Sequence, residues 1–561
     1  MQHDWLKLYP DGVKSTIDID QYSSVMELIE DSFRKWPNRM AYSCMGVSLT
    51  FAEIDELSKQ FAAYLQEECG LVKGDRLAIQ MPNCLQYPIV LFAALRCGAT
   101  VVNTNPLYTA SELRHQLQDA NPKVLIILAN FAATLGEVLD DVAIEHVLVS
   151  KIGDMMGIKG KVIDWVLKNI KKQIKPYKNV PQNPFKKALR LGKSYTYKRP
   201  ELNHEDIAFL QYTGGTTGLS KGAMLSHKNI IANTLQIAEW KKPCLEEGKE
   251  TIITALPLYH VFALTVNCLS ILKIGGSNVL IVNPRDMKAF IKEMKKQPFS
   301  VITGVNTLFN GLCEQPEFKA MDFSALKVSV GGGMAVQQAV ADRWQSITGC
   351  PIVEGFGLTE TSPVLTCNPT NGTQLIGSVG IPVPSTEVSL RDEKGEVVEE
   401  GQPGEIWGKG TQIMKGYWNN PTATADMIQN GWLQTGDIGI KMPNGYYRIV
   451  DRKKEMICVS GFNVYPNEVE DALAKNEKIK EVGVIGVPDA KTTEGVKAYV
   501  IKRDKSLTEE EVILHSKTFL TGYKRPRSVH FVEELPKSNV GKILRRKIKE
   551  MDQASFPEKW T

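Results

Sequence analysis

The chain has 561 residues, which is too long for one compact domain, so we expect it to divide into two or more domains. Hydrophobic residues make up 43% and charged residues 23% of it, the composition of an ordinary globular, soluble protein. The net charge of +4 is small for the whole chain, and no nucleic-acid recognition motif accompanies it, so no nucleic acid is expected as a partner.

Simple patterns in the sequence argue against a secretory signal, a membrane span, disulfides and a zinc site. The first five residues contain neither a basic nor an apolar region, so no secretory signal is expected. The longest apolar stretch, residues 261–272, is too short and too polar to cross a bilayer. The ten cysteines are scattered, without a C-x-x-C pair, which favours free thiols in a reducing cytosol over disulfides or a zinc site.

In chain order, helical patterns alternate with short apolar runs. Residues 51–64 have the spacing of a helix, and residues 76–81 have that of a buried strand. Further strands are predicted at 124–128, 147–149, 207–210, 251–256, 279–282 and 328–330. This alternation predicts an α/β fold with parallel sheets covered by helices.

Residues 151–200 concentrate the positive charge, with fourteen Lys or Arg residues against two Asp residues. Lysines fall mainly opposite an apolar set at helical spacing, which consists of Ile163, Val166, Leu167, Ile170 and Ile174, with Trp165 beside them. A basic amphipathic helix with an aromatic residue is typical of a segment on an anionic membrane surface. A helix half-buried on the protein core has the same pattern, so both interpretations stay open.

A glycine- and hydroxyl-rich loop follows the strand predicted at 207–210. Its residues include Thr213, Gly214, Gly215, Thr216, Thr217, Gly218 and Lys221. Glycines allow close approach of the backbone to a ligand, and the free N–H groups, hydroxyls and lysine together suit a polyphosphate. The spacing differs from the Walker pattern. The loop therefore predicts binding of a nucleoside triphosphate, with the chemistry left open.

From about residue 385 the pattern changes to short strands separated by glycine-rich turns. Residues 385–450 are predicted to form an antiparallel or barrel-like subdomain. The charged residues 451–454 are a plausible hinge, and residues 455–561 have a separate α+β pattern. We expect a large N-terminal domain, residues 1–450, joined through this hinge to a small mobile C-terminal domain.

Four other segments bear on the nucleotide loop. In residues 354–360, Phe356 suits a base, Thr359 a phosphate and Glu360 a magnesium ion. Asp437 follows a tight turn and suits a ribose diol. Residues 451–452 and residues 536–543 are the third and fourth of these segments. Each segment alone is weak, because acidic residues in glycine-rich loops are often only turn residues.

Together, the order and spacing of these segments resemble the adenylate-forming superfamily, which includes acyl-CoA synthetases, luciferases and peptide-synthetase adenylation domains. Residues 255–264, 460–470 and 535–542 are similar to the bacterial long-chain acyl-CoA synthetase branch of that superfamily. The resemblance covers essentially the whole chain. It implies a two-step reaction in which a fatty carboxylate attacks the α-phosphorus of ATP, and coenzyme A then takes the acyl group from the adenylate. Such a reaction feeds fatty-acid degradation and lipid metabolism.

The resemblance also assigns roles to residues. The expected ATP-binding residues are Thr213, Gly214, Gly215, Thr216, Thr217, Gly218, Lys221, Gly332, Gly333, Glu354, Gly355, Phe356, Gly357, Thr359, Asp437, Arg452 and Lys542. The expected catalytic residues are Lys542, Thr359, Glu360, Lys221 and His260, with Glu360 holding Mg²⁺. Lys454 matches the hinge position, and Ser460, Gly461 and Phe462 match a coenzyme A channel.

His260 matches a residue at the mouth of the acyl site, although a structural histidine in a turn is the alternative. The apolar residues after it are either core or tunnel lining, with Phe262 and Leu264 as candidate gates. The expected partners are a long-chain fatty acid, ATP, coenzyme A and an anionic membrane, with the protein cytoplasmic and peripheral on the inner face of the cytoplasmic membrane. The alternatives are a medium-chain or aryl acid–CoA ligase, an acyl-adenylate ligase serving a carrier protein, and a non-catalytic fatty-acid-binding or membrane scaffold.

Overall fold

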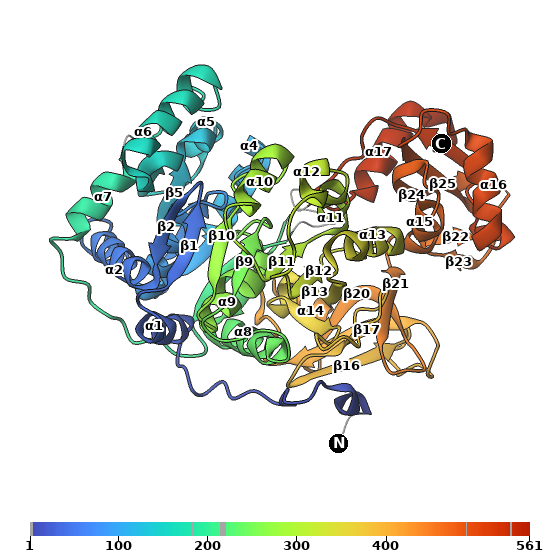
Figure 1. The fold of residues 1–561 in the computed structure, drawn as a ribbon, viewed down its shortest axis with the longest axis horizontal. Coiled ribbons are helices and arrows are strands. Elements are labelled where there is room, and N and C mark those ends of the chain that lie inside the picture. The colour runs from blue at the N-terminus through green and yellow to red at the C-terminus, as the bar shows by residue number, and fades with distance from the viewer. Residues whose placement is uncertain (1–3, 182, 214–219, 490, 539–540, 561) are drawn as a thin grey trace.

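Four β-sheets organise the part of the chain that the computed structural model describes, which is residues 4–181, 183–213, 220–489, 491–538 and 541–560. Two large sheets with their helices form most of the larger N-terminal part, which we call the large domain. The smaller C-terminal part, from β22 (Ile457–Val459) onward, is called the small lobe and lies at one end of the molecule. Helices α6 (Gly157–Trp165) and α7 (Phe185–Gly192) lie at the other end (Figure 1). The predicted α/β fold, with a larger N-terminal and a smaller C-terminal part, is confirmed.

The first large sheet has the strand order β18-β8-β7-β4-β3-β5-β6, and its strands from β7 to β6 run parallel. Its strands are β3 (Arg76–Gln80), β4 (Thr100–Asn103), β5 (Val124–Leu128), β6 (His146–Ser150), β7 (Ile207–Tyr212), β8 (Gly222–Ser226) and β18 (Gly416–Tyr417). Associated helices are α2 (Phe51–Glu67), α3 (Gln86–Arg96), α4 (Ala110–Ala120), α5 (Ala132–Gly136) and α7 (Phe185–Gly192). The buried strands are nearly continuous apolar runs, as expected for a parallel sheet covered on both faces.

The second large sheet has the order β15-β14-β13-β12-β11-β9-β10-β1-β2, with parallel strands from β13 to β1. Its strands are β1 (Met40–Cys44), β2 (Val47–Thr50), β9 (Thr251–Thr254), β10 (Ser277–Leu280), β11 (Val301–Gly304), β12 (Val328–Gly331), β13 (Ile352–Gly357), β14 (Val364–Cys367) and β15 (Ile381–Pro382). Its helices are α1 (Val25–Lys35), α8 (His227–Lys241), α9 (Ser270–Lys273), α10 (Met287–Met294), α11 (Asn306–Cys313), α12 (Pro316–Lys319) and α13 (Gln338–Thr348).

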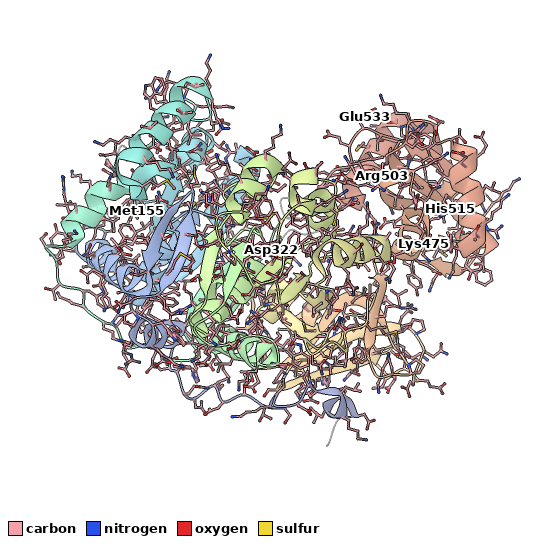
Figure 2. The ribbon with its side chains drawn as sticks, viewed as in Figure 1. Met155, Asp322, Lys475, Arg503, His515 and Glu533 are labelled. Carbon is pink, nitrogen blue, oxygen red and sulfur yellow. The ribbon has the colours of Figure 1, made fainter. Side chains whose placement is uncertain are left out.

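Two smaller sheets complete the fold. An antiparallel sheet contains β16 (Thr386–Arg391), β17 (Gly404–Gly410), β19 (Ile428–Gln429), β20 (Trp432–Lys441) and β21 (Tyr447–Arg452), next to α14 (Pro421–Met427). The small lobe contains β22 (Ile457–Val459), β23 (Phe462–Val464), β24 (Ile479–Asp489), β25 (Thr493–Lys502) and β26 (Ser528–Phe531) with α15 (Pro466–Ala474), α16 (Glu509–Phe519) and α17 (Arg545–Ser555). Lys475, Arg503, His515 and Glu533 mark this lobe in Figure 2. The lobe has an apolar core of its own.

Helix α8 carries a buried polar stripe that fixes it against loops of the large domain. Asn229 donates to the carbonyls of Thr411 and Ile413 at 2.8 and 2.7 Å. Further along the helix, Asn233 donates to the Val364 carbonyl and Gln236 to the Pro384 carbonyl, at 2.8 and 2.7 Å. These side chains satisfy buried carbonyl groups that would otherwise lack partners, so they fix the helix against these loops.

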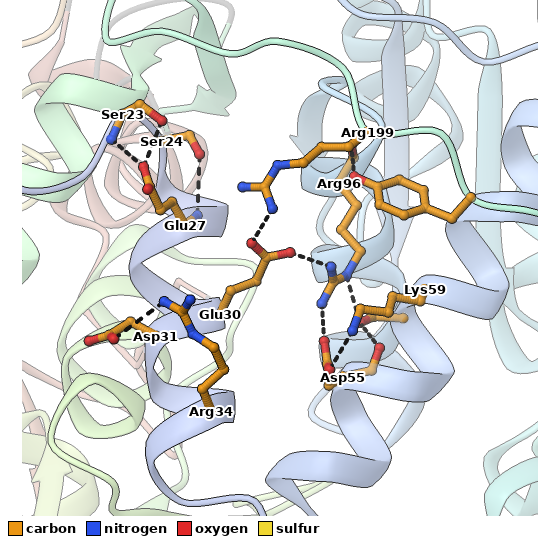
Figure 3. A network of polar contacts seen from close by, with 12 residues as sticks. Ser23, Ser24, Glu27, Glu30, Asp31, Arg34, Asp55, Lys59, Arg96 and Arg199 are labelled. Atoms are coloured by element: carbon orange, nitrogen blue, oxygen red, sulfur yellow. Dashed lines mark hydrogen bonds and ion pairs between the residues drawn. The ribbon is translucent and has the colours of Figure 1, made fainter.

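A buried arginine joins three helices near the first sheet (Figure 3). Arg96 of α3 has no exposed side-chain surface, and its guanidinium pairs with Glu30 of α1 at 2.5 Å and with Asp55 of α2. Glu30 also pairs with Arg199 at 2.7 Å. Because both carboxylates are oriented by the same arginine, removing it would leave two partly buried charges without that partner.

The basic segment forms helix α6 (Gly157–Trp165), followed by a π-helical turn (Val166–Ile170). Ile163 and Leu167 pack against the core, but the helix predicted to continue to Ile174 ends earlier. A second apolar strip faces solvent, and we call it the α6 strip: Ile158, Val162, Trp165 and Ile170, with exposed fractions of 83%, 59%, 58% and 62%. The helix therefore packs on the core with one side and exposes apolar side chains on another. Within the described part of the chain, no helix has the length and apolar character needed to span a bilayer.

Candidate active site

A cavity of about 1350 Å³ collects residues from both large sheets, the antiparallel sheet and the small lobe. Its lining includes the ends of β7, β12 and β13, part of β20, residues 452–455 and the loop before α17. The carboxyl ends of parallel strands are the usual place for a ligand in an open α/β sheet. The sequence-predicted residues can be located relative to this cavity.

On one side of the cavity lie the described parts of the glycine-rich loop. Thr213 and Lys221 both line it, and the Thr213 N–H donates to the Lys221 carbonyl at 3.0 Å. The Lys221 ammonium lies 4.9 Å from the centre of the Tyr417 ring, a cation–π contact. The other predicted residues of this loop, Gly214, Gly215, Thr216, Thr217 and Gly218, lie outside the described residues.

Thr359 and Glu360 follow β13 in a short 3-10 turn and also line the cavity. The Tyr417 hydroxyl donates to Glu360 Oε1 at 2.5 Å, which orients the carboxylate. Burial and the neighbouring Glu360 carboxylate both raise the pKa of Tyr417, so the phenol stays a donor. No cluster of three His, Cys, Asp or Glu residues suited to a metal occurs among the described residues. A single carboxylate beside the predicted phosphate-binding residues nevertheless fits Mg²⁺, which is commonly held by one or two carboxylates and the phosphates of its substrate.

The glycine-rich edges of β12 and β13 form another part of the lining. Gly332, Gly333, Gly355, Phe356 and Gly357 are all exposed to the cavity. A Cβ atom on Gly332 would lie only 3.0 Å from the Phe262 ring, so a side chain at this position would require the ring to shift by a few tenths of an ångström.

Glu354 differs from its neighbours because its side chain is not part of the lining. Its carboxylate accepts hydrogen bonds from the N–H groups of Val336 and Gly377 at 2.9 and 2.8 Å. Burial raises the pKa of Glu354 to about 7. These contacts make it a support for the two loops it joins, while a direct nucleotide contact stays a prediction.

Asp437 and Arg452 are cross-strand partners on β20 and β21. The Arg452 Nε lies 3.3 Å from Asp437 Oδ1, and Arg452 lines the cavity while Asp437 lies directly behind it. Burial raises the pKa of Asp437, and the nearby Arg452 and Lys542 charges oppose this shift.

Lys542 extends from the small lobe into the same cavity, which Lys454, the residue predicted to be the hinge, also lines. The Ser538 N–H donates to the Lys542 carbonyl at 2.7 Å. The Thr307 hydroxyl donates to the carbonyl of the neighbouring Gly541 at 3.1 Å, which links this part of the small lobe to the large domain. Burial and the nearby Arg452 charge lower the pKa of Lys542 to about 8.

His260 stands where the polar part of the cavity meets an apolar limb. Its Nδ1 accepts from the Phe262 N–H at 3.3 Å, and burial lowers its pKa to about 4, so the imidazole is neutral near pH 7. Phe262 lines the cavity, whereas the other gate candidate, Leu264, is buried in the core outside the lining. The limb is lined mainly by Ile237, Trp240, Val261, Val266, Val328, Val330 and Val353.

The predicted coenzyme A residues are not brought to the cavity in this arrangement. Ser460 and Gly461 form the turn between β22 and β23, with positive φ angles of 51° and 83°. Phe462 is 56% exposed and stacks on Tyr523 with ring centres 4.8 Å apart. Their role stays a prediction.

Sequence reasoning missed three residues of the site and its surroundings. Tyr417 orients Glu360, and Lys241 lines the apolar limb. Arg545, also in the lining, pairs with Glu470 at 2.7 Å and with other carboxylates beside the hinge. Of these three residues, only Tyr417 could have been found from the sequence, because it is an aromatic residue that follows a glycine turn.

The chain is similar to known proteins over almost its whole length. The profile described as AMP-binding enzyme matches residues 29–418, and the one described as AMP-binding enzyme C-terminal domain matches residues 468–542. A long-chain-fatty-acid–CoA ligase of Escherichia coli O6:H1 is 50% identical over 98% of both chains. The enzyme of that name from Haemophilus influenzae is 48% identical over 100% of both. The crystal structure of the anthranilate CoA ligase AuaEII with anthranoyl-AMP has the same fold, with a TM-score of 0.86 at 24% identity, covering 96% of this chain and 100% of the other.

Proposed function

This chain belongs to the AMP-binding enzyme family, and from that premise we propose that it is an ATP-dependent ligase that converts long-chain fatty acids to their coenzyme A thioesters. The fatty carboxylate attacks the α-phosphorus of ATP, which forms acyl-adenylate and releases pyrophosphate. The thiol of coenzyme A then attacks the acyl carbonyl and releases AMP. The observation that carries the proposal is one cavity that joins cationic and glycine-rich walls to an apolar limb.

In the first step, two anions must meet, so neutralising and aligning charge is the main task of the site. Lys221 and Thr213 would hold the β- and γ-phosphates, and Thr359 the α-phosphate. Lys542 would stabilise the charge that develops at the α-phosphorus. Glu360 would hold Mg²⁺, which neutralises phosphate charge when bound. Phe356 and the glycines of β12 would contact adenine, and Asp437 with Arg452 would hold the ribose.

The acyl chain would occupy the limb beyond His260 and Phe262. Each methylene buried there contributes roughly 0.8 kcal/mol, so long chains bind more tightly until the limb is filled. A neutral His260 at its entrance suits a site that must accept a carboxylate without trapping it as an ion pair.

The second step needs a different arrangement of the small lobe. We infer a hinge at residues 451–454, between a domain of residues 1–450 and one of residues 455–561, with Lys454 as the pivot. Rotation there would withdraw Lys542 and bring Ser460, Gly461 and Phe462 to the coenzyme A channel.

A pyrophosphate-release assay over acids of graded length, with and without coenzyme A, tests this function. We expect ATP-dependent release that increases with chain length, and AMP and acyl-CoA formation only with coenzyme A. Preference for medium-chain or aryl acids, or transfer only to a carrier protein, would support one of the two alternative ligases. Absence of release with every acid would support a non-catalytic scaffold.

Contact with an anionic membrane is the second part of the proposal, and it rests on the α6 strip. Its four apolar side chains are more than half exposed, and Lys161, Lys168, Lys171 and Lys172 beside them are exposed as well. Apolar side chains that can enter the interface, next to lysines that attract acidic headgroups, suit a peripheral site. The strip lies at the opposite end from the small lobe, so the lobe can rotate while α6 is docked (Figure 1). With this contact, the enzyme would act in the cytoplasm, peripherally on the inner face of the cytoplasmic membrane.

A further inference from the structure

The apolar limb of the cavity extends deep into the large domain along β12. Gly331, Gly332 and Gly333 line the nucleotide side, at the carboxyl end of this strand. Val330 and Val328, on one face of the same strand, line the limb further in. At about 3.3 Å per residue, the limb therefore runs roughly 10 Å along β12 beyond its glycine end.

A lysine lines this deep part of the limb. Lys241 is the last residue of α8, is 5% exposed, and belongs to the lining together with Trp240 and Val266. Its Nζ donates to the Val266 carbonyl at 3.1 Å and to the Ser270 hydroxyl at 2.7 Å. Both partners are neutral, and no ion pair of Lys241 with a described carboxylate is present.

An ammonium group has three N–H donors, and two neutral acceptors satisfy neither the third donor nor the charge. The surrounding side chains supply no carboxylate partner: Val328, Val330 and Ile237 are apolar. The nearby Cys244 and Cys367 thiols stay neutral, because burial raises the pKa of both. Burial also lowers the pKa of Lys241 to about 7. A buried donor in the wall of a ligand cavity is suited to a ligand that brings an acceptor oxygen.

We propose that Lys241 forms a second polar recognition site at the far end of the acyl limb, which binds an oxygen function at the ω-end of the fatty acid. This inference rests on the proposed ligase function and specifies its substrate class: ω-hydroxy and α,ω-dicarboxylic acids whose length spans the limb. The apolar walls bind the methylene groups between the two polar ends. The ω-group takes no part in the reaction, so the bonds that form and break at the carboxylate are those already described.

The test compares acids that differ only at the ω-end. Pyrophosphate release is measured for a saturated acid, its ω-hydroxy form and its dicarboxylic form over a series of chain lengths. For each chain length, kcat/KM for the ω-oxygenated acid is divided by kcat/KM for its parent acid. In the wild type, this ratio should be highest at one chain length. Lys241→Met should lower that ratio by about tenfold or more, the effect of losing one hydrogen bond to a charged group. It should also raise kcat/KM for the parent acid, because methionine offers the methyl end an apolar contact.

Lys242→Met is the matched control. This neighbouring lysine is exposed and pairs with Glu239 at 2.6 Å, so its loss should leave the ratio and the basal activity unchanged. If Lys241→Met does not fold, Lys241→Gln keeps a donor for the Val266 carbonyl without the charge and should still lower the ratio for the dicarboxylic acid.

The outcomes separate this inference from the function on which it rests. If parent acids are activated but the ratio shows no peak, or if Lys241→Met changes all acids equally, Lys241 is only a structural link between α8 and Ser270. If no acid of any class is activated by the wild type, the ligase function itself is wrong.

Discussion

Replacing Lys542 with alanine provides the most direct test of the site. Lys542 is on the small lobe, whereas Lys221, Thr359 and Glu360 belong to the large domain, yet all four line one cavity. Loss of one preorganised group that stabilises transition-state charge typically costs about 10²–10³-fold in rate, or about 3–4 kcal/mol. We therefore expect Lys542→Ala to slow adenylate formation by at least about 100-fold.

The pH dependence of the adenylation rate tests the role of Lys542 independently. The pKa of Lys542 is lowered to about 8, mainly by burial, so its charged form is present below that pH and is lost as pH rises through it. If the charged form is needed, adenylation should be fastest below about pH 7 and should fall about tenfold per pH unit well above pH 8. Lys542→Arg keeps its charge at high pH and should move this decline upward.

The assay follows the two half-reactions separately by rapid-quench measurement. Adenylate formation is measured from fatty acid and ATP, and thioester formation from supplied acyl-adenylate and coenzyme A. Lys505→Ala removes an exposed lysine from the same lobe and should change neither step. Equal loss of both steps in Lys542→Ala, or a loss of less than tenfold in adenylation, would refute the assigned role.

Three other changes test the hinge, the fold and the membrane contact. Lys454→Pro should restrict the hinge and slow thioester formation at least tenfold while adenylation persists; the same half-reaction assay checks this, and loss of adenylation alone would contradict it. Arg96→Met should lower the free energy of unfolding by about 3–5 kcal/mol in urea titrations, because two partly buried carboxylates each lose their fully buried cationic partner and keep only the more exposed Arg199 or Lys59. Arg34→Met, at an exposed pair, should cost less than about 1 kcal/mol. The double variant Ile158→Ser, Trp165→Ser should lose binding to anionic vesicles in sedimentation assays, and unchanged binding would exclude the α6 strip.

The sheet strands were predictable because their cores are apolar runs with clear ends. Residues 124–128 coincide with β5, in which every residue is buried. The strand predicted at 207–210 is two residues longer, since Gln211 and Tyr212 continue β7. Gln211 is buried and accepts from Asn103 Nδ2 at 3.1 Å, so a polar residue continues the strand through a tertiary contact that no local pattern reveals.

Helical periodicity was less reliable in the basic segment. Ile174 fits the helical spacing, but it lies beyond the π-helical turn and packs on a different apolar cluster. The helical spacing therefore wrongly assigned Ile174, a loop residue, to the apolar face of the helix. It also gave no sign that Ile158 and Val162 would be exposed, because exposure depends on which side of α6 meets the core.

The location of the site depended on motifs, and its finer geometry could not be predicted. Glycine spacing pointed to the loop at Lys221, and the family resemblance linked it to Lys542, over three hundred residues away in the chain. No local signal indicated that the Lys241 ammonium would reach the Val266 carbonyl. That contact depends on the packing of α8 against the π-helical segment that contains Val266, which is a property of the packed molecule.

Away from the proposed hinge at residues 451–454, individually modest polar contacts join the large domain to the small lobe, which is consistent with one site serving two steps. Polar contacts across this boundary include Thr307 with Gly541 at 3.1 Å, Asn310 with the Lys480 carbonyl at 3.5 Å, and Arg503 with Glu314 at 3.4 Å. Each contributes on the order of 1 kcal/mol or less. The lobe's own core would survive its rotation. Two arrangements can thus lie close in free energy, so ligand binding can select between them without unfolding either part.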